Sequence, residues 1–172
     1  MGLFNLTSDV GEVGRTDPTR LDEAMGLLQE LRELRRNDDV PAIREELAKG
    51  LVNLITSTGQ LGRTDGDKLV QAEGLLMETV GLAEKDPREQ VWSAVVKASL
   101  NLAAAVGNGH KQFYSFVSRA MILGTLEPEF LPVQRELFRQ AGIEDDAEFE
   151  ALLAATKQHL STVHGDDDEK QT

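Results

Sequence analysis

The chain has 172 residues, the size of a single domain, and it contains no cysteine, which excludes disulfide bonds and thiolate metal sites. Its formal net charge is −12, and a surface of that sign repels phosphate backbones, so nucleic acid is not expected as a partner. No apolar run approaches the roughly 18 to 20 residues that a membrane-spanning helix needs. We therefore expect a cytoplasmic protein without a membrane partner.

Every long segment has helical periodicity, and strand patterns are absent from the sequence. Asp17 is placed to cap the first helix, with Pro18 at its first position, and Gly59 is placed to end the second helix. The predicted helices cover, in chain order, residues 18–37, 41–58, 66–84, 87–106, 113–126, 129–140 and 147–163. The sequence thus predicts an all-α fold of about seven helices.

An internal repeat is the clearest signal in the sequence. The tetrapeptide Gly-Arg-Thr-Asp occurs at Gly14–Asp17 and again at Gly62–Asp65. Aligned without a gap, residues 14–61 and 62–109 share 16 identities in 48 positions, several of them at polar sites that an amphipathic pattern would not enforce. A fixed period of this size is typical of stacked units that bury their apolar faces against each other. We expect the two windows to form equivalent helical hairpins.

The repeat suggests a division of the chain. Residues 1–13 are an N-terminal segment, and residues 14–163 form a single helical-repeat domain that ends in a divergent capping unit, residues 110–163. Residues 164–172 are expected to be a disordered acidic tail. Consecutive antiparallel hairpins predict a right-handed stack.

The fourth predicted helix is apolar on nearly all sides, so we expect it to be central, with Trp92 as a packing residue. Helical spacing leaves one polar stripe, which contains Lys97 and Asn101, and the matching stripe one repeat earlier contains Lys49 and Asn53. Stacking the two helices side by side would align these pairs, so we predict that the four residues line one exposed groove. Alternatively, the stripes are only solvated faces, or the asparagines cap loop carbonyls.

Residues 39–55 and 86–103 each contain a turn with Asp and Pro, followed by a helix that reaches an Asn-Leu pair near its end. This pattern resembles the groove-lining helix of armadillo repeats and their HEAT relatives. With the preceding helices, the resemblance covers about residues 17–106. It differs in its period, which is longer than that of the usual armadillo repeat.

The resemblance implies an α-solenoid that binds peptides. In armadillo proteins, the asparagine that matches Asn53 and Asn101 lies on a concave groove and holds the backbone of an extended peptide. A tryptophan is common four residues before it, and Lys49 and Lys97 stand in that place here. Recognition of basic peptides is therefore not expected, and we expect an extended or acidic segment of a protein or peptide partner.

Residues for catalysis are not apparent in the sequence. Phosphate-binding loops, dinucleotide-binding fingerprints and nucleophile elbows are absent, and His110 has no useful spacing to His159 or His164. The last two histidines, with Asp166–Asp168, offer at most an adventitious metal site. We expect no cofactor and no enzymatic activity, and interpret the chain as a non-catalytic binding scaffold.

Two alternatives to the binding scaffold stay open. One is an enzyme on a HEAT-like scaffold, of the DNA glycosylase type, which would need a basic groove and a catalytic carboxylate beside aromatic residues. The other is a purely structural subunit of a larger assembly.

Overall fold

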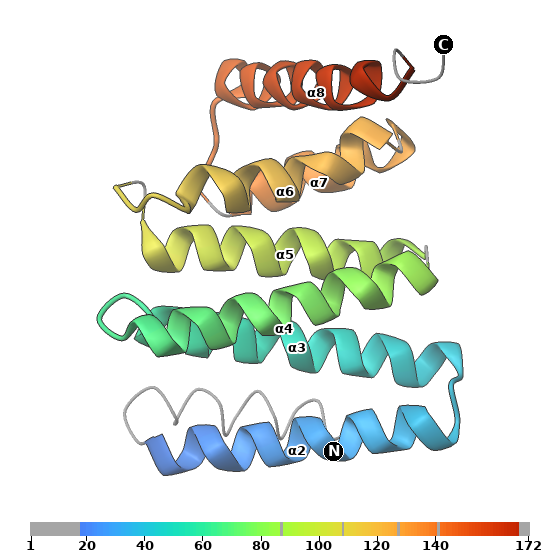
Figure 1. Ribbon diagram of the computed structural model, residues 1–172, viewed down its shortest axis with the longest axis vertical. Helices are drawn as coiled ribbons and strands as arrows, with labels where there is room; N and C mark the ends of the chain where they lie inside the picture. The colour runs from blue at the N-terminus through green and yellow to red at the C-terminus, as the bar shows by residue number, and fades with distance from the viewer. Residues whose placement is uncertain (1–17, 87, 108, 127, 141, 169–172) are drawn as a thin grey trace.

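The computed structural model describes residues 18–86, 88–107, 109–126, 128–140 and 142–168. The α-helices in these residues are labelled as in Figure 1: α2 (Pro18–Asn37), α3 (Pro41–Leu61), α4 (Gly66–Lys85), α5 (Glu89–Val106), α6 (Phe113–Leu126), α7 (Leu131–Gln140) and α8 (Asp146–Asp168). A 3₁₀ turn, Pro128–Phe130, precedes α7. The described residues contain no strand, and the prediction of an all-α fold with about seven helices is confirmed.

The helices lie across the long axis of the molecule, with α2 at one end and α8 at the other (Figure 1). Helix α3 packs against α2, α4 and α5, and α5 packs against α4, α6 and α7. Helices α3 and α5 are therefore in direct contact although α4 separates them in the sequence. In the part of the chain that the structure describes, no helix combines the length and the apolar character needed to cross a membrane.

The helix boundaries follow the 48-residue register of the sequence. Helix α2 spans residues 18–37 and α4 spans residues 66–85, while α3 begins at residue 41 and α5 at residue 89. The interior of the two windows also corresponds. Pairs that are buried at both positions include Leu21 and Leu69, Ala24 and Ala72, Leu28 and Leu76, Leu47 and Val95, Leu51 and Ser99, and Leu54 and Leu102.

The correspondence fails at Leu34, which is 46% exposed, whereas its partner in the register, Leu82, is 2% exposed. Helix α4 packs closely against both α3 and α5, whereas α2 packs mainly against α3 and reaches α4 through the ion pair between Arg32 and Glu78. The same apolar position is therefore covered in the second hairpin and open in the first. The difference comes from position in the molecule and not from the local sequence.

Gly59 does not end α3, as the sequence predicts, because the helix continues to Leu61. Gly59 is buried where α3 meets α5, and a Cβ atom on it would lie 2.6 Å from the Cδ1 atom of Leu102. The glycine thus permits close approach of the two helices. Helix α8 also continues past its expected end at Val163, to Asp168.

Trp92 is partly buried and packs against the hydrophobic core, as the sequence predicts. The core is continuous from α2 to α8, and Phe138 and Phe149, which are fully buried, lie edge to face with ring centroids 5.2 Å apart. Because edge-to-face pairs are favourable beyond their buried area, this contact helps to hold α8 on the rest of the core.

The second Gly-Arg-Thr-Asp copy forms the turn between α3 and α4. The Asp65 side chain caps α4 by accepting hydrogen bonds from the backbone nitrogens of Asp67 and Lys68, at 3.0 and 3.4 Å. A Cβ atom on Gly62 would lie 2.9 Å from the backbone nitrogen and Cα of Leu69. The tetrapeptide therefore has a structural role here. The first copy, Gly14–Asp17, lies outside the described residues.

We predict that Gly62→Ala lowers the free energy of unfolding by about 1–3 kcal/mol, because the new methyl group meets backbone that cannot move aside cheaply. The matched control is Gly74→Ala in α4, where a Cβ atom would meet nothing within 4 Å. That change should raise stability by about 1 kcal/mol through helix propensity. Urea unfolding measures both, and equal effects of the two variants would contradict the role given to Gly62.

Candidate functional site

A cavity of about 540 Å³ lies between α3, α5 and α7. Its lining residues are Glu45, Lys49, Val52 and Asn53 of α3, Glu89, Gln90, Ser93, Ala94 and Lys97 of α5, and Val133 and Leu137 of α7. Three of the four residues predicted to line a groove, Lys49, Asn53 and Lys97, therefore come together. The fourth, Asn101, does not line this cavity.

Helical spacing explains how α3 and α5 supply the polar side chains. Residues 45, 49 and 53 of α3 succeed one another at intervals of four, as do residues 89, 93 and 97 of α5, so each set follows one helix face. The side of the cavity that belongs to α7, with Val133 and Leu137, is missing from the sequence prediction. The apolar pair at i and i+4 is a signal for this face, but α7 lies outside the repeat on which the predicted groove rests.

The two lysines of the cavity differ in their ion pairs. Lys49 Nζ lies 2.8 Å from Glu45 Oε1 and 3.2 Å from Glu46 Oε1, and its hydrogen bond to Glu45 raises the pKa of the lysine. Lys97 is exposed and forms no ion pair with another described residue, and the half-buried side chain of Asn53 has no hydrogen-bond partner among them. Lys97 and Asn53 are thus among the unused donors of the cavity.

Asn101 instead connects the two inner helices. Its Nδ2 donates a hydrogen bond of 2.8 Å to Thr56 Oγ1, and the threonine hydroxyl donates in turn to the carbonyl oxygen of Val52, at 2.9 Å. Asn101 is therefore neither part of a solvated stripe nor a cap on a loop carbonyl. Asn101 links α5 to α3 through a side chain that the sequence analysis did not single out.

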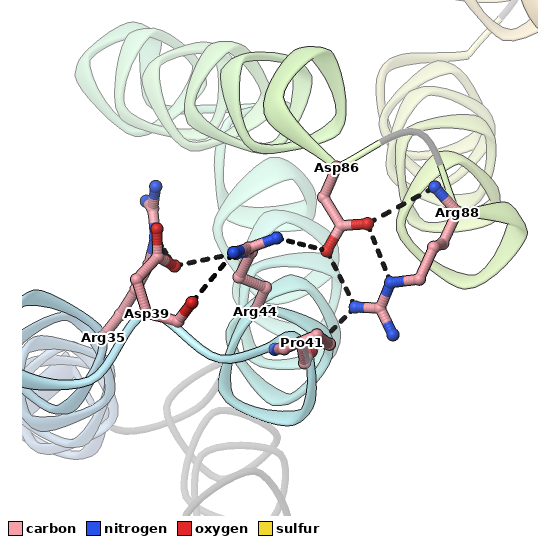
Figure 2. A network of polar contacts seen from close by, with 6 residues as sticks. All are labelled: Arg35, Asp39, Pro41, Arg44, Asp86 and Arg88. Atoms are coloured by element: carbon pink, nitrogen blue, oxygen red, sulfur yellow. Dashed lines mark hydrogen bonds and ion pairs between the residues drawn. The ribbon is translucent and has the colours of Figure 1, made fainter.

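A polar network holds the N-terminal ends of α3 and α5 together (Figure 2). At its centre is Asp86, which is 3% exposed and lies between α4 and α5. Its carboxylate accepts hydrogen bonds from Arg88 Nε and Nη2, both at 2.8 Å, and from Arg44 Nη1 of α3 at 3.2 Å. Two guanidinium groups, one from α3 and one from the residue that immediately precedes α5, therefore share one buried carboxylate.

The same arginines also bind the α2–α3 loop and the first residue of α3 (Figure 2). Arg88 Nη2 donates to the carbonyl oxygen of Pro41 at 2.8 Å. Arg44 donates to the carboxylate and the carbonyl oxygen of Asp39, both at 2.8 Å, and Arg35 of α2 donates to that carboxylate at 3.2 Å. The network thus spans the α2–α3 loop, the α4–α5 loop and the first turn of α3.

The repeat register pairs Asp86 with Asp38, yet only Asp86 is buried. No local sequence pattern indicates the network, because Arg44 and Asp86 are 42 residues apart and belong to different units. The hydrogen bonds from the Arg88 side chain, with smaller contributions from the Arg88 backbone and from Arg44, lower the pKa of Asp86 from 3.8 to about 2. The carboxylate therefore stays ionised throughout the neutral range.

The described residues contain no group of three or more histidine or acidic side chains that could hold a metal ion. The side chains of His159, His164 and Asp166–Asp168 lie outside the described residues. His110 Nδ1 accepts a hydrogen bond from the backbone nitrogen of Gln112 at 3.2 Å, which places it in the turn before α6.

Comparisons of the chain with models of protein families, with curated proteins and with solved structures found no match.

We predict that stability falls in acid because of Asp86. Its native pKa lies below the unfolded value, so its contribution is present above about pH 4 and is lost as the pH falls through about 2. Since one pKa unit corresponds to about 1.4 kcal/mol, the loss is on the order of 2 kcal/mol. Urea unfolding at several pH values should show a smaller acid loss in Asp86→Asn than in the wild type. Identical pH profiles would contradict this assignment.

A second prediction distinguishes the structural roles of Asn53 and Asn101. Asn101→Ala should lower the free energy of unfolding by about 1 kcal/mol, because it removes the hydrogen bond to Thr56. Asn53→Ala, at the matching position, removes no hydrogen bond to a described residue and should leave stability almost unchanged. Thermal and urea unfolding compare the pair, and a larger loss for Asn53→Ala would reverse the roles assigned here.

Proposed function

We propose that the chain is a non-catalytic helical-repeat scaffold, which holds an extended acidic segment of a partner protein in the cavity between α3, α5 and α7. The observation that carries the proposal is the convergence of Lys49, Asn53 and Lys97 beside apolar side chains. In the armadillo-like interpretation, these are the residues of a peptide-binding groove.

The contacts between helices support the repeat interpretation. Helices α3, α5 and α7 follow one another in contact. On the other side, side chains connect α2 to α4 through Arg32 and Glu78, and α4 to α6 through Met77 and Arg119. Two rows of helices, each from alternate positions in the chain, are what a solenoid of hairpins requires. We propose that the rows form a right-handed armadillo- or HEAT-like stack.

The chemistry of the lining supports an extended acidic ligand. The amide of Asn53 offers both a donor and an acceptor to a peptide backbone, and Lys97 offers a cation that no described residue neutralises. Val133 and Leu137 supply apolar surface for a side chain of the ligand. A carboxylate near Lys97 would then be attracted locally in spite of the acidic surface as a whole.

The lining favours this proposal over a DNA glycosylase. The two lysines of the cavity are matched by two glutamates, Glu45 and Glu89, so the cavity has no excess of positive charge for a phosphate backbone. The lining residues also include no aromatic side chain on which a base would stack.

The test begins with random peptides displayed against the immobilised full chain, followed by fluorescence anisotropy with the selected peptides. We predict that acidic sequences are selected, and that Asn53→Ala and Lys97→Gln each weaken their binding roughly tenfold, which corresponds to about 1.4 kcal/mol. The matched control is Lys85→Gln, an equal charge change at an exposed site in the last turn of α4. It should leave binding unchanged.

Three outcomes would refute the proposal. These are selection of basic peptides, equal loss of binding in Lys85→Gln and Lys97→Gln, and unchanged binding in both cavity variants.

A further inference from the structure

A second cavity, of about 560 Å³, lies beside the C-terminal half of α2. Its lining residues are Gln29, Arg32, Arg35 and Arg36 of α2, Asp39 of the α2–α3 loop, Leu47 of α3 and Glu78 of α4. Three guanidinium groups thus meet two carboxylates, which leaves one positive charge in excess on a protein whose formal net charge is −12.

We propose that this arginine cavity binds a small phosphorylated ligand, with the phosphoryl oxygens held by Arg35 and Arg36 beside a fixed Arg32. The planar guanidinium group presents its N–H donors in a geometry that matches phosphate oxygens, often through two bonds at once. The proposal is independent of the peptide site, which shares only α3 with this cavity and none of its lining residues.

Arg32 is the preorganised member of the cavity. Its Nε and Nη2 donate to the two carboxylate oxygens of Glu78 at 2.9 and 2.5 Å, and the arginine side chain is only 24% exposed. Its third nitrogen, Nη1, lies 3.4 Å from Gln29 Oε1. The ion pair therefore fixes the guanidinium group and leaves Nη1 in weak contact, free to exchange Gln29 for a ligand oxygen.

Arg35 can give up its hydrogen bond to Asp39 at little cost in free energy. It donates to Asp39 at 3.2 Å, but the same carboxylate oxygen accepts a shorter hydrogen bond, 2.8 Å, from Arg44. When Arg35 turns to a ligand, Asp39 keeps an arginine partner. Arg36 is exposed and forms no ion pair with any other described residue. Two positive charges are thus available to a ligand without leaving a carboxylate unpaired.

Arg35 and Arg36 also lie in the last turn of α2, where cations stabilise the helix dipole. If stabilisation of the helix were their whole role, removing them would lower stability and leave anion binding unchanged. If the two arginines hold a ligand, removing them weakens anion binding. Anion affinity therefore distinguishes the two interpretations, and its measurement does not depend on an enzymatic activity.

The experiment is calorimetric titration of the full chain with pyrophosphate at constant ionic strength. We expect saturable binding that weakens at least tenfold in the double variant Arg35→Gln/Arg36→Gln. Single variants are compared with Arg63→Gln, which removes the same charge from an exposed arginine in the α3–α4 turn, at the opposite ends of the helices (Figure 1). Arg36→Gln should weaken binding, and Arg63→Gln should not.

Malonate, a small dianion without phosphorus, serves as the second titrant, and it should bind more weakly than pyrophosphate. Equal affinity for the two anions would overturn the phosphoryl assignment. Absence of saturable binding to the wild type, an equal loss in Arg36→Gln and Arg63→Gln, or unchanged binding in the double variant would overturn the site itself. Circular dichroism of each variant in chloride confirms that the variants are folded.

Discussion

The buried carboxylate of Asp86 is the interaction on which the placement of the inner helices depends. A buried charge is costly unless it is paired and hydrogen-bonded, and Asp86 meets that requirement only with Arg44 and Arg88 beside it. Arg44 belongs to α3, and Arg88 immediately precedes α5. The requirement to pair one carboxylate therefore brings the N-terminal ends of these two helices together, and with them the residues on either side of the first cavity.

Beyond their N-terminal ends, α3 and α5 make further contacts. Farther along the helices, Asn101 donates to Thr56, and the side chain of Leu102 occupies the space that Gly59 leaves open. The same network reaches the second cavity, because Asp39 accepts hydrogen bonds from both Arg44 and Arg35. One set of polar contacts thus supports both proposed sites, although they share only α3 and differ in charge.

The sequence predicted the periodic parts of this arrangement well. The repeat placed the helices of the first two hairpins and brought Lys49, Asn53 and Lys97 to one cavity, since equal spacing on equivalent helices produces matching faces. The repeat did not predict the role of Asn101, which donates to the Thr56 hydroxyl, whereas Asn53 has no hydrogen-bond partner among the described residues. The contribution of α7 and the Asp86 network depend on contacts between distant segments, and no local pattern encodes them. Gly59 was misassigned because a close helix contact and a helix end both favour glycine.

A double-mutant cycle between Arg44 and Asp86 tests the central claim most directly. The free energy of unfolding is measured for the wild type, Arg44→Ala, Asp86→Ala and the double variant. If the two side chains act together across the α3–α5 junction, the double variant loses clearly less stability than the sum of the two single losses. Losses that add within experimental error would show that the carboxylate and Arg44 contribute independently, and would contradict this account of how α3 and α5 are held together.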